Sequence, residues 1–90
     1  MKVAWTLRAL SDVEEVYRFV AADKPEAARQ LAARLLDAGD LSGQRPFSGH
    51  TTRKEGVREL VVGSHLLLYR VRDTVELLSV TQGARRRKKA

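Results

Sequence analysis

The sequence predicts a single α+β domain in which an N-terminal helical hairpin packs on a mainly antiparallel sheet, with the element order β-α-α-β-β-β. Three observations lead to this prediction. Apolar residues recur at helical spacing in two neighbouring segments, short runs of alternating apolar residues flank them, and two strand-like runs meet at Gly63-Ser64. Ninety residues suffice for one hydrophobic core and leave no room for a second domain.

The first strand and the first helix are predicted within residues 1–22. Val3 and Trp5 alternate in MKVAWT, which is typical of a short strand, and Trp5 is expected in the core. A helical stripe then predicts a helix over residues 8–22: Ala9, Val13, Val16, Tyr17 and Val20. Four charged residues are expected on its solvated side: Asp12, Glu14, Glu15 and Arg18.

A second helix is predicted from Pro25 to about residue 41. Pro25 suits the first helical position, where its missing amide hydrogen costs no hydrogen bond. The apolar stripe continues through Ala28, Leu31, Ala32, Leu35 and Leu36, and its alanines allow close approach of the first helix. Residues 41–55 lack periodicity and are predicted to form a loop, which either docks on the core through Pro46 and Phe47 or becomes ordered with a partner.

The segment GVRELVVGSHLLLYRVR, residues 56–72, predicts a β-hairpin because glycine readily adopts the positive φ of a two-residue turn. The register then pairs Val62 with His65, and Arg58 with Tyr69. One face is expected in the core: Leu60, Val62, Leu67, Tyr69 and Val71. The other face mixes aliphatic and charged residues: Val57, Glu59, Val61, Leu66, Leu68, Arg70 and Arg72. Residues 75–81 predict the last strand.

Residues 1–84 are expected to form the domain and residues 85–90 a basic tail. The net charge is +6, and five of the positive charges are contributed by Arg85, Arg86, Arg87, Lys88 and Lys89. The domain itself is therefore close to neutral. A basic tail favours nucleic acid or an acidic protein as partner, although a short terminal run of charge is also compatible with simple solvation.

Composition argues against several classes of function. The absence of cysteine excludes disulfides and thiolate metal sites, and the lack of a signal sequence or a membrane-length apolar run predicts a cytoplasmic protein with no membrane association. His50 and His65 are both predicted in turns, without a second titratable group at a defined spacing. No catalytic residue, metal site or cofactor is therefore predicted.

Several short motifs in this order resemble the ParE/RelE superfamily of bacterial toxins over nearly the whole chain. They include Asp23-Lys24-Pro25, Arg58-Glu59-Leu60-Val61, Tyr69-Arg70-Val71 and Gly83-Ala84-Arg85. The resemblance implies a type II toxin that is neutralised by a cognate antitoxin, ParD-like or otherwise acidic-tailed, whose C-terminal segment wraps the toxin.

The superfamily contains two activities, and the resemblance favours the ParE-like branch of DNA gyrase inhibitors. RelE-like members cut mRNA on the ribosome with basic residues at positions that correspond to Val57, Glu59 and Leu66 here, none of which is basic. Gln82 also stands where many relatives have a histidine. The protein is therefore expected to be non-catalytic. The alternatives are a metal-independent mRNA endonuclease that uses Arg58, Arg70 and Arg85, and a non-toxic binding module.

The mixed hairpin face is the predicted contact surface. The antitoxin is expected to contact seven residues of this surface and its surroundings: Val61, Leu66, Leu68, Arg53, Arg58, Arg70 and Arg72. The gyrase target is expected to contact the tail through Arg85, Arg86 and Arg87. The helical hairpin is an alternative docking surface.

Overall fold

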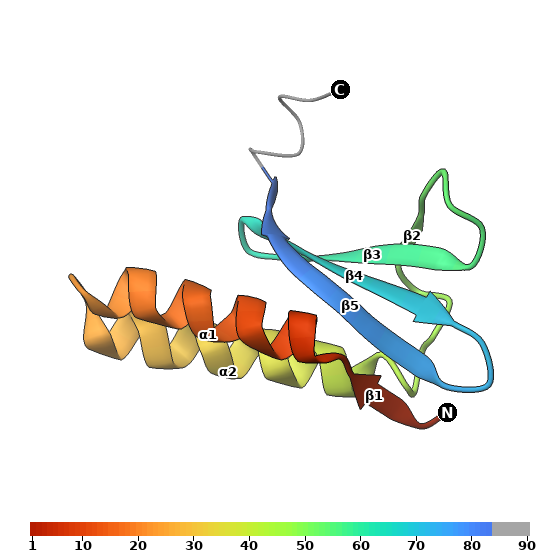
Figure 1. Ribbon diagram of the computed structural model, residues 1–90, viewed down its shortest axis with the longest axis horizontal. Helices are drawn as coiled ribbons and strands as arrows, with labels where there is room; N and C mark the ends of the chain where they lie inside the picture. The colour runs from red at the N-terminus through yellow and green to blue at the C-terminus, as the bar shows by residue number, and fades with distance from the viewer. Residues whose placement is uncertain (84–90) are drawn as a thin grey trace.

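Two helices pack on one face of a five-stranded sheet in the computed structural model, which describes residues 1–83 (Figure 1). The elements are β1 (Val3–Trp5), α1 (Leu7–Ala21), α2 (Pro25–Leu41), β2 (His50–Thr51), β3 (Val57–Val62), β4 (His65–Val71) and β5 (Val75–Gln82). The α+β fold class and the helical hairpin are confirmed. The predicted order lacks only β2, a two-residue strand within the segment expected to be a loop.

The helix boundaries follow local sequence signals. Thr6 is the N-cap of α1, and its Oγ1 accepts a hydrogen bond from the backbone N–H of Ala9. Pro25 opens α2, as predicted. The two helices run antiparallel, and their connected ends extend past the sheet (Figure 1). Neither helix has the length and apolarity to cross a membrane, within residues 1–83.

The sheet order is β1-β5-β4-β3-β2, with β1 parallel to β5 and every other pair antiparallel. In the β3–β4 hairpin, Val62 pairs with His65 and Arg58 with Tyr69, which confirms the predicted register. The φ of Gly63 is 61°, in the left-handed region that this turn requires. One side of the hairpin therefore faces the helices and the other faces away from them.

The core lies between the helices and the sheet. Leu67, Tyr69, Leu77 and Leu35 are fully buried there, whereas Trp5 packs against the core at its edge and is only partly buried. The Trp5 ring occupies the space beside Gly39, where a Cβ would lie 2.2 Å from the ring, and its Nε1 donates to Asp40 at 3.0 Å. Gly39 thus permits the contact between β1 and α2.

The segment between α2 and β3 is held by the sheet rather than by a buried aromatic ring. The hydroxyl of Tyr69 donates to the carbonyl oxygen of Pro46 at 2.8 Å and accepts from the N–H of Gly49 at 2.9 Å. Phe47 is 64% exposed, so the predicted docking of its side chain on the core is wrong. The segment is ordered by hydrogen bonds to a core tyrosine.

Asp12 corrects a second expectation. Its side chain is only 16% exposed and points from α1 to β5, where Oδ2 accepts a hydrogen bond from the backbone N–H of Val80 at 2.9 Å. The helical stripe predicted a solvated residue because its apolar members do not reveal a polar contact with a distant strand.

Candidate functional site

The sheet face turned away from the helices, here called the open face, is the candidate site. It is formed by alternate residues of β3, β4 and β5, and His50 of β2 lies at its edge. By register, its members include Val57, Glu59, Val61, Leu66, Leu68, Arg70, Glu76 and Thr81. No helix of residues 1–83 covers this face (Figure 1).

The apolar part of the open face is a cluster at the turn end of the hairpin. Val61 is 61% exposed and pairs directly with Leu66, so the two side chains are cross-strand neighbours. Leu68, partly buried, lies two residues further along β4. The structure therefore brings together the three apolar residues that were predicted to contact a partner.

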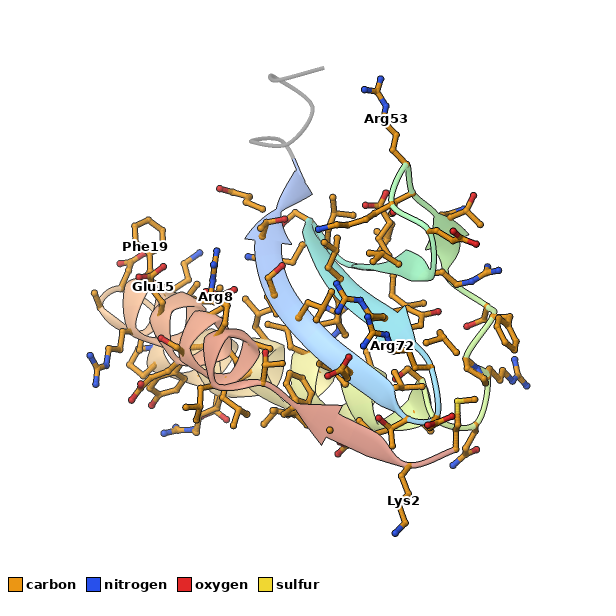
Figure 2. The ribbon with its side chains drawn as sticks, turned by 45° about the vertical axis from the view of Figure 1, so that its right-hand side comes forward. Lys2, Arg8, Glu15, Phe19, Arg53 and Arg72 are labelled. Atoms are coloured by element: carbon orange, nitrogen blue, oxygen red, sulfur yellow. The ribbon has the colours of Figure 1, made fainter. Side chains whose placement is uncertain are left out.

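The charged part lies at the other end of the same face. Arg70 is paired with Glu76 on β5 and lies diagonal to Glu59 on β3. Arg72 follows at the end of β4 and is exposed (Figure 2). Two arginines and two glutamates thus share the face, and their formal charges cancel. The Oε1 of Glu76 is buried and has no hydrogen-bond partner within residues 1–83.

Arg58 lies on the opposite side of the sheet from this cluster. It pairs with the core residue Tyr69, and its Nη1 donates to the carbonyl oxygens of Phe47 at 3.1 Å and Gly49 at 2.9 Å. Its guanidinium also stacks over the Phe47 ring, 5.2 Å from the centroid. The structure therefore does not bring Arg58 together with Val61, and Arg58 helps to fix the segment before β3.

Arg53 is also separate from the open-face cluster. It lies at the tip of the loop between β2 and β3, and its side chain points away from the sheet (Figure 2). Arg53 and Arg58 belong to the β2 edge of the molecule, whereas Arg70 lies in β4 and Arg72 directly after it. A partner must pass around this edge to contact all four.

His50 is a candidate functional residue that the sequence did not reveal. It lies in β2 directly opposite Glu59, which places an imidazole and a carboxylate side by side on the open face. The sequence placed His50 in a loop because two residues give no alternation pattern. No local signal connects it with a glutamate nine positions later.

His65 has a different environment. It begins β4 opposite Val62 and Gln82 and is partly buried on the helix side of the sheet. Burial lowers the pKa of His65 below its usual value because the charged imidazolium is desolvated. Its Nδ1 is buried without a hydrogen-bond partner in residues 1–83. The predicted turn position is therefore wrong for His65, which is the first residue of β4 and is partly buried.

Two further points concern metal ligands and the predicted target-binding residues. Within residues 1–83, no group of three or more histidine, cysteine, aspartate or glutamate side chains is arranged to hold a metal ion. The predicted target-binding residues Arg85, Arg86 and Arg87 lie outside the described residues.

Comparisons with known proteins identify the family of the chain that carries this site. Residues 3–87 match the family described as the ParE toxin of the type II toxin-antitoxin system parDE. The chain is 36% identical over 81 residues to Y4kP of Sinorhizobium fredii, provisionally named a toxin, which covers 88% of this chain and 84% of Y4kP. It is 33% identical over 86 residues to Toxin RelE2 of Caulobacter vibrioides, which covers 93% of this chain and 97% of RelE2.

A solved structure has the same fold. The chromosomal ParDE toxin-antitoxin system from P. aeruginosa includes a chain that matches with a TM-score of 0.81, covering 91% of this chain and 95% of that one. The sequence identity is 19%, so this match supports the architecture alone.

Proposed function

Since this chain belongs to the ParE toxin family of type II toxin-antitoxin systems, we propose that it is a non-catalytic toxin that binds DNA gyrase and interferes with its DNA reaction, and that a cognate antitoxin neutralises it. The observation that carries the proposal is the charge balance of the open face. Arg70 and Arg72 are offset there by Glu59 and Glu76. Such a surface suits a protein better than a polyanion.

Ribonuclease chemistry makes different demands. An enzyme that cleaves RNA without a metal must bind phosphate and stabilise the negative charge that develops in the transition state, which requires converging cations. The strand positions that are basic in RelE-like relatives are Val57, Glu59 and Leu66 here. Val57 and Leu66 carry no charge and Glu59 is negative, so none of the three side chains can neutralise a phosphate. The absence of basic residues at these three positions supports binding of a protein rather than RNA at the open face.

The discriminating experiment is plasmid supercoiling by purified gyrase in the presence of increasing toxin. We expect dose-dependent loss of supercoiling and accumulation of cleaved DNA, and we expect prior mixing with the antitoxin to restore activity. Unaltered supercoiling over a wide range of toxin concentration would reject gyrase as the target. In cells, induction should cause filamentation and DNA-damage signalling.

A ribosome-dependent mRNA endonuclease is the second candidate, and one observation favours it. His50 and Glu59 are cross-strand neighbours on the open face, with Arg70 diagonal to Glu59, so an acid-base pair and a cation lie near one another. This candidate predicts rapid translation arrest and cut transcripts after induction. Both effects should disappear in a His50→Ala variant that still folds. Primer extension that shows intact messages in cells arrested by the wild-type toxin would eliminate it.

We further propose that the antitoxin covers the open face. Val61, Leu66 and Leu68 provide apolar contacts, while Arg70 and Arg72 meet acidic residues of the antitoxin, and Arg53 and Arg58 extend the contact around the β2 edge. The membership in a toxin-antitoxin family supports such a partner. The corresponding mutational test is given in the Discussion.

A further inference from the structure

A cavity lies at the edge of the sheet, apart from the open-face cluster. It is partly open to solvent, has a volume of about 270 Å³ and is lined by the 47–56 segment, the beginning of β3 and the end of β4. Val57, which is 3% exposed, and Val71 provide apolar surface, and the exposed ring of Phe47 forms part of its wall. Thr51 of β2 and Arg58 of β3 also line it and are cross-strand partners. Because Arg58 pairs in turn with the core residue Tyr69, both lie on the helix-side face of the sheet.

Two of the three charged residues of the described chain that line this cavity are cationic. Arg58 is fixed by its two bonds to carbonyl oxygens, both through Nη1, so Nε and Nη2 have no hydrogen-bond partner among residues 1–83. Lys54 also lines the cavity, is exposed and forms no ion pair in the described part of the chain. Glu55 is the one acidic lining residue. An oriented guanidinium beside an apolar surface is suited to a carboxylate that accompanies an apolar side chain.

The main chain beside the cavity can also bind a partner. β2 is the last strand of the sheet, so one of its edges has no neighbouring strand in residues 1–83. Thr51 belongs to β2 and also lines the cavity. An extended peptide that adds to a free strand edge gains main-chain hydrogen bonds, and adjacent pockets for its side chains provide specificity.

We propose that this cavity anchors an extended acidic segment of the antitoxin, with a large apolar side chain in the cavity and a neighbouring carboxylate on Arg58 and Lys54. The inference rests on the proposed pairing with an antitoxin. The volume is just below the range of small-molecule sites, about 300–1,000 Å³, and is sufficient for one large side chain. A segment that crosses the β2 edge would reach this cavity from the open face, so one partner could contact both Arg70 and Arg58.

The test uses the full-length toxin and the purified antitoxin encoded beside it, with affinity measured by fluorescence anisotropy. Lys54→Glu reverses a charge at the cavity, and Thr51→Trp places a large side chain at the β2 edge. Each is expected to weaken binding by about tenfold or more. Lys54→Glu repels the carboxylate of the antitoxin, and Thr51→Trp blocks the entry of its apolar side chain. Lys2→Glu is the matched control: it makes the same charge change at an exposed residue before β1, at the opposite edge of the sheet (Figure 2), and should leave affinity unchanged.

A photo-crosslinking amino acid at position 51 provides a second readout that does not depend on affinity. The crosslinked antitoxin segment, identified by mass spectrometry, is expected to contain a large apolar residue next to aspartate or glutamate. Full affinity of both cavity variants, or crosslinks to a segment without such residues, would overturn the inference while leaving the partnership intact. Failure of the wild-type toxin to bind the antitoxin at all would instead overturn the proposed partnership, and the inference with it.

Discussion

The carboxylate of Asp12 in α1 binds the backbone N–H of Val80 in β5, 68 residues later in the chain, at a distance of 2.9 Å. The reason lies in the sheet edge. β1 pairs with β5 only as far as Leu77, so the outer edge of β5 has no strand neighbour beyond that residue in the described chain. There, Thr6 Oγ1 donates to the carbonyl oxygen of Leu77 at 2.7 Å, and Asp12 accepts from Val80. Side chains of the first helix and its N-cap thus form hydrogen bonds to the β5 backbone that a neighbouring strand would otherwise form.

Replacing Asp12 by alanine should therefore lower the free energy of unfolding by about 1–3 kcal/mol, because the Val80 N–H loses its partner at a partly buried site. Glu15→Ala is the matched control, since Glu15 is exposed on the same helix (Figure 2) and its side chain forms no hydrogen bond or ion pair within residues 1–83; its effect should stay within about 0.5 kcal/mol. Urea denaturation measures both. Equal effects of the two substitutions would show that the Asp12–Val80 bond contributes no stability.

Replacing Tyr69 by phenylalanine tests what orders the segment before β3. The ring stays in the core, but the Pro46 carbonyl oxygen and the Gly49 N–H lose their shared partner. We expect a loss of about 1–2 kcal/mol of stability. Hydrogen exchange at the Gly49 amide should become faster, while exchange in the centre of β4 changes only with global stability. Unchanged protection of Gly49 would mean that the Arg58 bonds alone hold the segment.

Acidification should destabilise the protein through His65. Burial lowers the pKa of His65 in the folded state, whereas in the unfolded chain it is near the ordinary value of 6.5. As the pH falls below 6.5, the unfolded chain binds a proton that the folded chain resists, so the free energy of unfolding declines until the pH passes below the folded pKa. Urea denaturation between about pH 5 and pH 8 should show a shallower decline for His65→Gln than for the wild type. Parallel pH profiles would exclude a contribution from His65.

The location of the antitoxin is tested by the double substitution Leu66→Asp and Arg70→Glu on the open face. It should abolish tight binding. Leu66→Asp would bury an unpaired charge in the interface, and Arg70→Glu would remove one partner of a charged pair, which costs about 2–5 kcal/mol. Leu7→Asp with Arg8→Glu makes the same changes on the exposed side of α1, where Leu7 is 85% exposed. Loss of binding only in the α1 variant would move the antitoxin to the helical hairpin.

The β-hairpin and the helical hairpin were predicted from sequence because their determinants are local. Gly63 permits the turn, and the turn fixes the pairing of residues 57–62 with residues 65–70. The same register places Arg58 with Tyr69 on the core side, so the sequence already contained the reason why Arg58 cannot join the open-face cluster. The family resemblance, carried by short motifs along the chain, is likewise confirmed.

The remaining features depend on contacts between segments that are far apart in the chain. β2 exists because His50 and Thr51 find a partner in β3, and only that pairing places His50 opposite Glu59. Asp12 is partly buried because β1 ends too early to cover β5. The sequence alone determined the periodic elements, the hairpin register and the toxin family, since each is written in local pattern. The tertiary structure decided which polar side chains serve the backbone and which remain for a partner, because that assignment depends on which hydrogen-bonding groups the folded chain leaves without a strand neighbour.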